Sequence, residues 1–484
     1  MATAGASDGD ETQRRERVKA RWSMLRQALL GSSSGNDDAG SGNRNSSNND
    51  NKFNEHSMNA FPGFHVIDRS ILPREDVTFD CNEAFNECGE NWNIVQNSFT
   101  STEGHNVRFL TREVKEQQQN NQESTVQSRM EALLSHRNHG VDNTGNVRVW
   151  DAEGTLAGFL LSLVLEREDA LKSEGKKRNA ELLEMRDKLR SMMIDTPAND
   201  SKGEHPMCNL LELGAGQAGL AGLAMAAASL SLESRTDNGK NECTEKTTQM
   251  KQLHVVLTDG HPKCVDNNAS CAKLMPKSER AKIQIDAQLL LWDSSSNGAD
   301  ACCEINKIIR DPTKMLNGNV TLCNTIDQST EADGLYHLCL ASDCVHFQEF
   351  HDGLLCTIAR TLVVDGVALM CQPKRGASLQ NFMKLVDAVN NASHSSVGDE
   401  KPSEALNCCK VTANGPLFHM VLFEDFYPKV STMHNSLLFG AKHEPTYRYD
   451  PDRHQPLLLV LQKLRPYDEN IDGELVRHQV KIRA

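Results

Sequence analysis

The residues in this chain whose spacing best suits ligand chemistry are three glycines that follow a short apolar run. In segment 209–228, NLLELGAGQAGLAGLAMAAA, the leucines predict a buried strand, and Gly214, Gly216 and Gly219 predict a tight turn. From Leu220 the spacing of apolar residues is helical. A strand, a glycine turn and a helix N-terminus together present free N–H groups and a partial positive charge to an anionic or polar ligand. We therefore expect a nucleotide-cofactor site at this turn.

The glycine spacing leaves more than one class of protein open. Gly214-x-Gly216-x-x-Gly219 also fits a dinucleotide fingerprint, so it does not separate a NAD-dependent oxidoreductase from an S-adenosylmethionine-dependent methyltransferase. Glu212, an acid inside the strand, favours the second class, because it gives the ELGxG opening that resembles the seven-stranded methyltransferases. A turn that only permits tight packing of helix on strand is the third interpretation.

A second polar group follows the next predicted strand, at 254–258. Asp259 and Gly260 end this strand, and a carboxylate at a strand tip can accept both hydroxyl protons of a ribose. The alternative role of Asp259 is to cap the helix that follows. Two more strands, 283–292 and 335–342, likewise end in acids, at Asp293 and Asp343.

Composition and charge limit what the chain can be. Of its 484 residues 38% are hydrophobic and 5% aromatic, so we expect one core of about 250 residues with polar segments around it. A net charge of −14 argues against general nucleic-acid binding, and no apolar run approaches the roughly 20 residues of a membrane span. Because the first twenty residues lack an apolar signal core, we expect a cytosolic or nuclear protein.

The cysteines are not spaced like metal ligands. The chain has 15 cysteines and no Cys-x-x-Cys, so we expect no metal site. Cys339 and Cys371 lie in apolar, strand-like runs, where a cysteine is typically a small core residue.

The order of elements predicts a Rossmann-like α/β domain. A helix with apolar residues at helical spacing follows Trp150, and its charged continuation over 166–193 is predicted to protrude. Strands then alternate with helices as far as two final apolar runs, 417–423 and 456–462, which lack a long helix between them. A parallel sheet that ends in an antiparallel C-terminal hairpin favours the seven-stranded methyltransferase class I fold, whereas a dehydrogenase would add further βα units.

The remaining segments divide the chain. We expect a basic amphipathic helix at 1–30, a disordered linker at 31–60, a small N-terminal β unit with a polar loop at 61–140, the methyltransferase-like domain at 141–470 and a tail at 471–484. Strand-like pieces in the β unit are 63–67 and 107–111, and a short strand is expected to end at Trp150. Polar inserts are expected near 195–206, 231–252, 294–334 and 393–410.

An ordered series of short motifs runs through most of these segments: Ala20-Arg-Trp-Ser-Met-Leu-Arg-Gln, Asp142-Asn-Thr-Gly-Asn-Val, Glu212-Leu-Gly-Ala-Gly, Leu220-Ala-Gly-Leu, Leu257-Thr-Asp-Gly, Leu291-Trp-Asp, Ala341-Ser-Asp-Cys, Pro373-Lys-Arg-Gly and Pro456-Leu-Leu-Leu-Val-Leu. With this series the chain resembles the calmodulin-lysine N-methyltransferase family, in the protein-lysine branch of the seven-stranded methyltransferases. The series is far more specific than any one of its motifs.

The resemblance implies a cofactor, S-adenosylmethionine, and the residues that bind it. It places the cofactor over Gly214 and Gly216, with Asp259 on its ribose. The other residues that it assigns to the cofactor are Trp150, Glu212, Gly260, Trp292, Asp293 and Ala341.

The resemblance also implies a substrate channel. Asp343 would face the methionine end of the cofactor and the incoming lysine, as the residue that positions the ε-amino group. Relatives carry an Asp-x-x-Tyr motif or another aromatic at this place, whereas this chain has His346 followed by Phe347. Which ring lines the lysine channel therefore stays open, and His346 fits equally a structural role.

The implied reaction is methylation of a lysine in calmodulin, with trimethylation expected, by a monomeric enzyme. Calmodulin is strongly acidic, so an acidic enzyme needs a local positive surface to bind it. Lys374, Arg375 and the basic helix at 1–30 are the candidates. Another protein substrate, a non-catalytic binding scaffold and a NAD-dependent oxidoreductase are the alternatives.

Overall fold

The computed structural model describes residues 59–60, 63–73, 92–102, 104–114, 149–166, 180–195, 207–233, 249–250, 252–276, 283–294, 296–310, 334–395, 415–440 and 447–483. All of them belong to one compact unit made of residues 58–115 and 140–484. The predicted basic helix at 1–30, most of the linker and large parts of the polar inserts lie outside the described residues.

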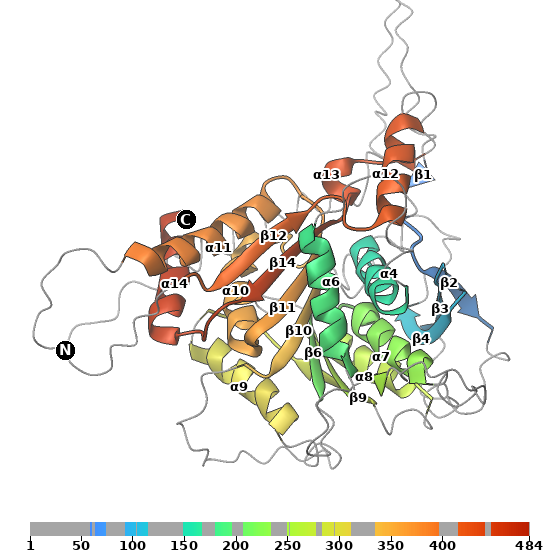
Figure 1. The fold of residues 1–484 in the computed structure, drawn as a ribbon, viewed down its shortest axis with the longest axis horizontal. Coiled ribbons are helices and arrows are strands. Elements are labelled where there is room, and N and C mark those ends of the chain that lie inside the picture. Colours follow the sequence, from blue (N-terminus) through green and yellow to red (C-terminus); the bar gives the residue numbers. More distant parts are fainter. Residues whose placement is uncertain are drawn as a thin grey trace, which may run out of the picture. The chain divides into compact units, whose positions relative to one another are not determined.

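A seven-stranded sheet forms the centre of this unit (Figure 1). Its strand order is β12-β14-β11-β10-β6-β8-β9. The five strands from β11 to β9 pair in parallel, and β14 is antiparallel to both of its neighbours. The bounds are β6 (Cys208–Leu213), β8 (Leu253–Asp259), β9 (Ile283–Leu289), β10 (Tyr336–Ser342), β11 (Leu362–Gln372), β12 (Phe418–Phe423) and β14 (Leu457–Lys463). The Rossmann-like, mostly parallel seven-stranded α/β sheet expected from the sequence is confirmed.

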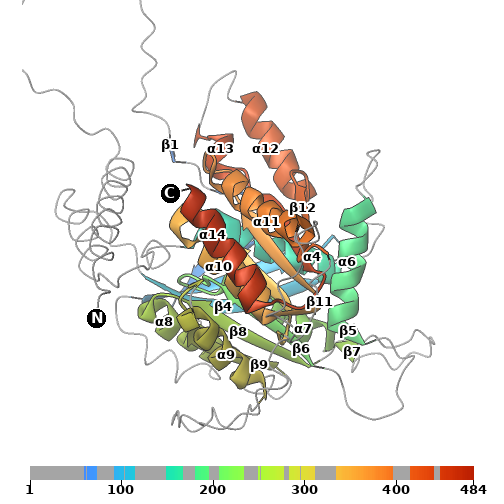
Figure 2. The ribbon, with the colours of Figure 1, turned by 90° about the vertical axis from the view of Figure 1, so that its left-hand side faces the viewer.

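Both faces of the sheet are buried, which explains why its strands are apolar at consecutive positions. Leu210 and Leu369 pack into the core on one face, and their neighbours Leu211 and Met370 pack into the core on the other. The first face is covered by α4 (Asp151–Leu165), α6 (Ala180–Met193), α7 (Leu220–Glu233) and α8 (Pro262–Lys273). The second is covered by α9 (Ser296–Arg310), α10 (His351–Thr361), α11 (Ser378–Ser395) and α14 (Glu474–Arg483). Figure 2 shows the sheet between α6 and the helices α10, α11 and α14.

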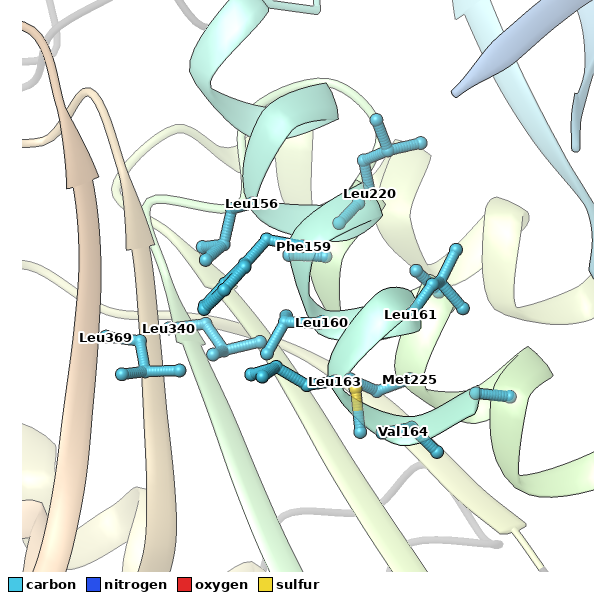
Figure 3. Close-up of a cluster of buried hydrophobic side chains, with 14 of the residues drawn as sticks. Leu156, Phe159, Leu160, Leu161, Leu163, Val164, Leu220, Met225, Leu340 and Leu369 are labelled. Carbon is cyan, nitrogen blue, oxygen red and sulfur yellow. The ribbon is translucent and has the colours of Figure 1, made fainter. Parts of the chain in front are cut away.

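The central helix of the first layer is α4, which is apolar on almost every side. Residues on opposite sides of it, Leu156 and Leu161, are both fully buried. Figure 3 shows Phe159, Leu160 and Leu163 of α4 directed toward Leu340 and Leu369 of the sheet. A helix that is apolar all round is a core helix, so the beginning of α4 is held rigidly at the edge of the sheet.

A small antiparallel sheet of β2 (Asp68–Leu72), β3 (Trp92–Thr100) and β4 (Asn106–Val114) precedes α4. The strand expected at 107–111 is the middle of β4, but the strand expected at 63–67 is wrong. Those residues run as an irregular segment against α4, where a Cβ on Gly158 would lie 2.2 Å from Cγ1 of Val66. Two strand pairs, β1 (Asn59–Ala60) with β13 (Tyr447–Arg448) and β5 (Ile194–Asp195) with β7 (Gln249–Met250), complete the described sheets.

Several expectations about local structure are wrong, because buried apolar faces were hidden in polar segments. The segment 180–193 does not protrude, since Leu189 of α6 is fully buried against the core. The polar insert at 294–334 contains α9, whose Ile305 is buried. Most of the predicted tail at 471–484 forms a helix, α14, whose Val476 is buried.

Two further expectations fail at connections. A helix, α12 (Pro428–Gly440), lies between the last two strands together with the short α13 (Pro451–His454), so these strands pair as antiparallel neighbours without forming a tight hairpin. The described residues before α4 are not a strand, because Trp150 is the N-cap of that helix. Among the described helices, none is both long and apolar enough to cross a membrane.

Candidate cofactor and substrate site

The predicted site residues lie near the carboxyl ends of the parallel strands, on the loops that follow them and at the beginning of α4. Because the carboxyl ends of parallel strands meet at one edge of a sheet, residues far apart in sequence come together there. The contacts described below join the turn after β6 to the tips of β8 and β10 and to the Trp292 loop after β9. They also join the tip of β10 to Trp150.

The glycine turn after β6 is fixed by the tip of β8. Gly214, Gly216 and Gly219 all have positive φ, between 57° and 64°, a conformation that glycine adopts without strain. The Gly216 N–H donates to Oδ2 of Asp259 at 2.9 Å, and the His261 N–H donates to Oδ1 at 2.8 Å. Gly260 is the residue between Asp259 and His261 in the sequence. A carboxylate oxygen can accept more than one hydrogen bond, so these contacts are compatible with a ligand hydroxyl on the same group.

The inner side of the turn contacts the loops of two other strands. A Cβ on Gly214 would lie 2.9 Å from Sγ of Cys344 and 3.1 Å from Cη2 of Trp292. The Cys344 thiol donates to the carbonyl oxygen of Leu213 at 3.2 Å. Only a residue without a side chain fits at Gly214, because Cys344 and Trp292 pack directly against its backbone.

Glu212 holds the helix that follows the glycine turn. Its Oε2 accepts the N–H of Gly222 at 2.8 Å, in the first turn of α7. Burial raises the pKa of this carboxyl to about 7, although the N–H groups of Gly222 and Ala221 lower it. The described contacts of Glu212 therefore orient α7 and the glycine turn. Ala341, in β10, is buried and accepts a hydrogen bond at its carbonyl oxygen from Nε2 of Gln372, at 3.2 Å.

The Trp292–Asp293 loop is held by residues that the sequence did not suggest. Nη1 of Arg360 donates to the carbonyl oxygen of Asp293 at 2.8 Å, and the same guanidinium pairs with Glu469 through Nε and Nη2. Nη1 of Arg477, on α14, donates to the carbonyl oxygen of Ser294 at 2.6 Å. The C-terminal helix thus supports the loop predicted to contact adenine. Nε1 of Trp292 is buried without a hydrogen-bond partner within the described part of the chain.

Asp343 follows β10 in a left-handed conformation, with φ of 53°. Its N–H donates to the carbonyl oxygen of Cys371 at 3.0 Å, which fixes the backbone. Nε of Arg375 donates to its Oδ1 at 3.2 Å and Nη2 donates to its Oδ2, so the guanidinium is bidentate. The same guanidinium lies over the ring of Trp150, 5.7 Å from the ring centre. The structure therefore brings Trp150, Asp343 and Arg375 together.

His346 and Phe347 form a partly exposed aromatic pair beyond Asp343. Their ring centres are 4.6 Å apart. The hydroxyl of Ser378 donates to the carbonyl oxygens of Val345 and His346, and the ring of buried His351 contacts the same Val345 carbonyl at 3.0 Å. This network fixes the backbone that carries both rings.

Glu153 is an acid near the site that the sequence analysis missed. Its Oε1 accepts the N–H of Trp150 at 3.1 Å, and its Oε2 has no hydrogen-bond partner within the described residues. Burial raises the pKa of this carboxyl well above its ordinary value, and nearby Glu212 raises it further. The spacing Trp150-x-x-Glu153 at a helix start, typical of an acid that reaches back to the N-cap, was the available signal.

No group of three or more histidine, cysteine, aspartate or glutamate side chains suited to a metal occurs in the part of the chain that is described. Cys339 and Cys371 are buried at 1% and 0% exposure, as expected of core residues. Burial raises the pKa of the Cys339 thiol to about 12, so it is not a thiolate near neutral pH.

Comparison with known proteins gives one relative of described activity. No family model matches the chain. A segment of 136 residues is 28% identical to a calmodulin-lysine N-methyltransferase of Arabidopsis thaliana and covers 28% of this chain. The match spans about a third of that relative, 35% of its length.

The similar solved structures share little sequence with this chain and include a [4+2]-cyclase as well as methyltransferases. A predicted O-methyltransferase of Agrobacterium tumefaciens is 12% identical, with 54% of this chain and 76% of that chain covered and a TM-score of 0.25. The CurJ carbon methyltransferase is also 12% identical, with 65% and 67% covered and a TM-score of 0.26.

The site fits S-adenosylmethionine, the cofactor expected of this fold. The buried Trp292 Nε1, which lies beside the glycine turn, can still donate a hydrogen bond to a ligand. The carboxylates of Asp259 and Asp343 supply acceptors and negative charge for a cofactor that carries hydroxyl groups, an ammonium and a sulfonium.

Proposed function

We propose that this chain is an S-adenosylmethionine-dependent methyltransferase. The observation that carries the proposal is the contact between Gly216 and Asp259, because it fixes the glycine turn and the acid proposed to bind the ribose in one position. This contact lies at the carboxyl ends of β6 and β8, in a sheet with the class I methyltransferase order. The antiparallel β14 disfavours an oxidoreductase, which would continue with parallel βα units.

In this proposal the cofactor lies across the carboxyl ends of the parallel strands. The backbone of Gly214, Gly216 and Gly260 contacts the cofactor. Asp259 accepts hydrogen bonds from its ribose hydroxyls. Trp292 and Asp293 lie beside the adenine, and Trp150 closes the methionine end. Glu212 and Ala341 act by holding the turn and the tip of β10 in place.

The acceptor is a lysine of a protein, and we propose calmodulin as the substrate. The support is the 28% identity over 136 residues to a calmodulin-lysine N-methyltransferase. Trimethylation is the expected extent of reaction. The aromatic pair of His346 and Phe347 gives a wall along which an aliphatic lysine side chain can pack.

The chemistry requires a neutral amine in line with a methyl group. When bound, the cofactor supplies the electrophilic methyl, and the protein supplies alignment. Lysine, with an unperturbed pKa of about 10.4, must lose a proton before it can attack. In this proposal partial desolvation beside Phe347 favours the neutral amine, whose proton passes to solvent, and Asp343 positions the ε-amino group for attack.

The test is methyl transfer from labelled S-adenosylmethionine to unmethylated calmodulin by the purified full chain, followed by mass mapping of the product. One lysine that gains mass in methyl-sized steps would support the reaction and the substrate together. Cofactor binding without transfer to calmodulin would overturn the substrate and send the search to other proteins. Absence of cofactor binding would overturn the proposed function.

A further inference from the structure

The side chain of Arg375 is paired with the Asp343 carboxylate, which the proposed reaction needs. Both oxygens of Asp343 accept hydrogen bonds from its guanidinium, and the side chains are 22% and 10% exposed. A lysine ammonium that approaches Asp343 must therefore meet a second cation on the same acid. Like charges at this distance repel, so either Arg375 moves or the lysine is excluded.

The backbone on each side of this ion pair is fixed, so only the arginine side chain is free to exchange. Arg375 has φ of 50°, its N–H donates to the carbonyl oxygen of Asp452 at 2.8 Å, and the Gly376 N–H donates to Oδ2 of the same residue at 2.7 Å. Asp343 is fixed in the same way by Cys371. Residues held in the left-handed region by such contacts cluster at binding sites. The long, flexible stem of Arg375 is the part that can swing.

Beyond Asp343, the described groups near the guanidinium include an aromatic ring and a histidine. The guanidinium lies over the Trp150 ring, and His454 nearby has a pKa lowered by burial and by Arg375 itself, so this histidine is neutral near pH 7. The carboxylates of Asp450 and Asp452 cap α13 and the Gly376 turn. An arginine released from Asp343 can pair with a carboxylate that the substrate brings.

We infer that Arg375 selects substrates whose target lysine is flanked by carboxylates. The lysine ammonium takes the place of the guanidinium on Asp343, and the guanidinium pairs with an acid of the substrate. This charge exchange keeps each carboxylate paired, whereas a lysine among neutral residues would leave Arg375 without a partner. The inference rests on the proposed function and adds to it a residue that determines specificity.

The test compares two peptides that differ only in the residues around one lysine, glutamate in the first and glutamine in the second. Binding is measured by fluorescence anisotropy on the full chain with S-adenosylhomocysteine bound, and transfer is measured with S-adenosylmethionine. We expect the wild type to prefer the acidic peptide by about tenfold in Kd and KM, and Arg375→Ala to reduce that ratio to about one. Arg375→Lys, which keeps the charge without the fork, should give an intermediate ratio.

The possible outcomes separate the inference from the proposed function. An acidic-peptide preference that survives in Arg375→Ala, or its absence in the wild type, would overturn the inference while methyl transfer stands. Equal loss of turnover on both peptides, with unchanged Kd ratios, would make Arg375 a residue that only positions Asp343. Cofactor affinity and the thermal unfolding midpoint show whether a variant has folded. If Arg375→Ala fails to fold, the peptide preference of Arg375→Lys decides between these outcomes.

Discussion

The backbone N–H of Gly216 donates to Oδ2 of Asp259 at 2.9 Å, so the turn after one strand is locked to the tip of the next. The other carboxylate oxygen accepts the N–H of His261, at the beginning of α8. One side chain that is only 8% exposed therefore sets the position of two loops. This arrangement makes Asp259 both a structural residue and a candidate ligand-binding residue.

Replacing Asp259 separates these two roles. Asp259→Ala leaves two backbone N–H groups without acceptors, which should cost about 1–3 kcal/mol of unfolding free energy and weaken S-adenosylmethionine binding at least about tenfold. Asp259→Asn keeps one acceptor and should lose less stability. Urea unfolding and calorimetric titration measure the two effects. Asp365→Asn, at a position with an exposed carboxylate, is the matched control, and wild-type cofactor affinity in Asp259→Ala would contradict the assignment.

Gly214 and Gly104 offer a matched pair for the glycine turn. Both have positive φ, 64° and 80°, but a Cβ on Gly214 would meet Cys344 and Trp292, whereas a Cβ on Gly104 would meet nothing within 4 Å. Either alanine should cost about 1–2 kcal/mol of backbone strain. Only Gly214→Ala should also abolish cofactor binding, because it displaces Trp292. Equal cofactor affinities in the two variants would show that steric closeness at Gly214 is irrelevant.

Arg360 supports the Trp292–Asp293 loop from the second helical layer. Its side chain is 6% exposed, and it joins the Asp293 carbonyl to Glu469. Arg360→Lys keeps the charge but cannot reproduce the forked geometry, so we expect KM for S-adenosylmethionine to rise by about three- to tenfold with little change in kcat. Arg453→Lys, in an exposed pair, is the control. A fall in kcat at unchanged KM would place Arg360 in another role.

The sheet was predictable because each of its strands carries its own signal. β6 and β10 are buried on both faces, so their residues are apolar at consecutive positions and acids or glycines end them. The same logic placed Asp259, Asp293 and Asp343 at one edge, since parallel strands share an edge for their carboxyl ends.

The partners of these residues were not predictable, because they depend on contacts between distant segments. Arg360 and Glu469 are 109 residues apart, and Asp343 and Arg375 are 32 apart. Arg375 was expected on the surface as a contact for an acidic substrate, and the structure places it on Asp343. The helix α12 was missed because nothing in the apolar pattern of its neighbours requires a helix between two antiparallel strands.

Glu212 should make the stability of the protein depend on pH between about 4.5 and about 7. Its ordinary pKa is 4.5, and burial raises the pKa in the folded protein to about 7. In this window the folded protein holds a proton that the unfolded chain has released, so unfolding free energy falls as pH rises. The loss is absent below about pH 4.5, is complete above about pH 7 and amounts to roughly 3 kcal/mol at most.

Glu212→Gln removes this titration while an amide oxygen still accepts the Gly222 N–H. We expect the difference in unfolding free energy between the variant and the wild type to move in favour of the variant as pH rises from 5 to 8, by up to roughly 3 kcal/mol. Urea unfolding at the two pH values measures it, and exposed Glu424→Gln should show no such change. Parallel pH profiles for Glu212→Gln and the wild type would mean that Glu212 is ionised in the folded protein at pH 5. The α7 cap would then be a charged one, strengthened by the helix dipole.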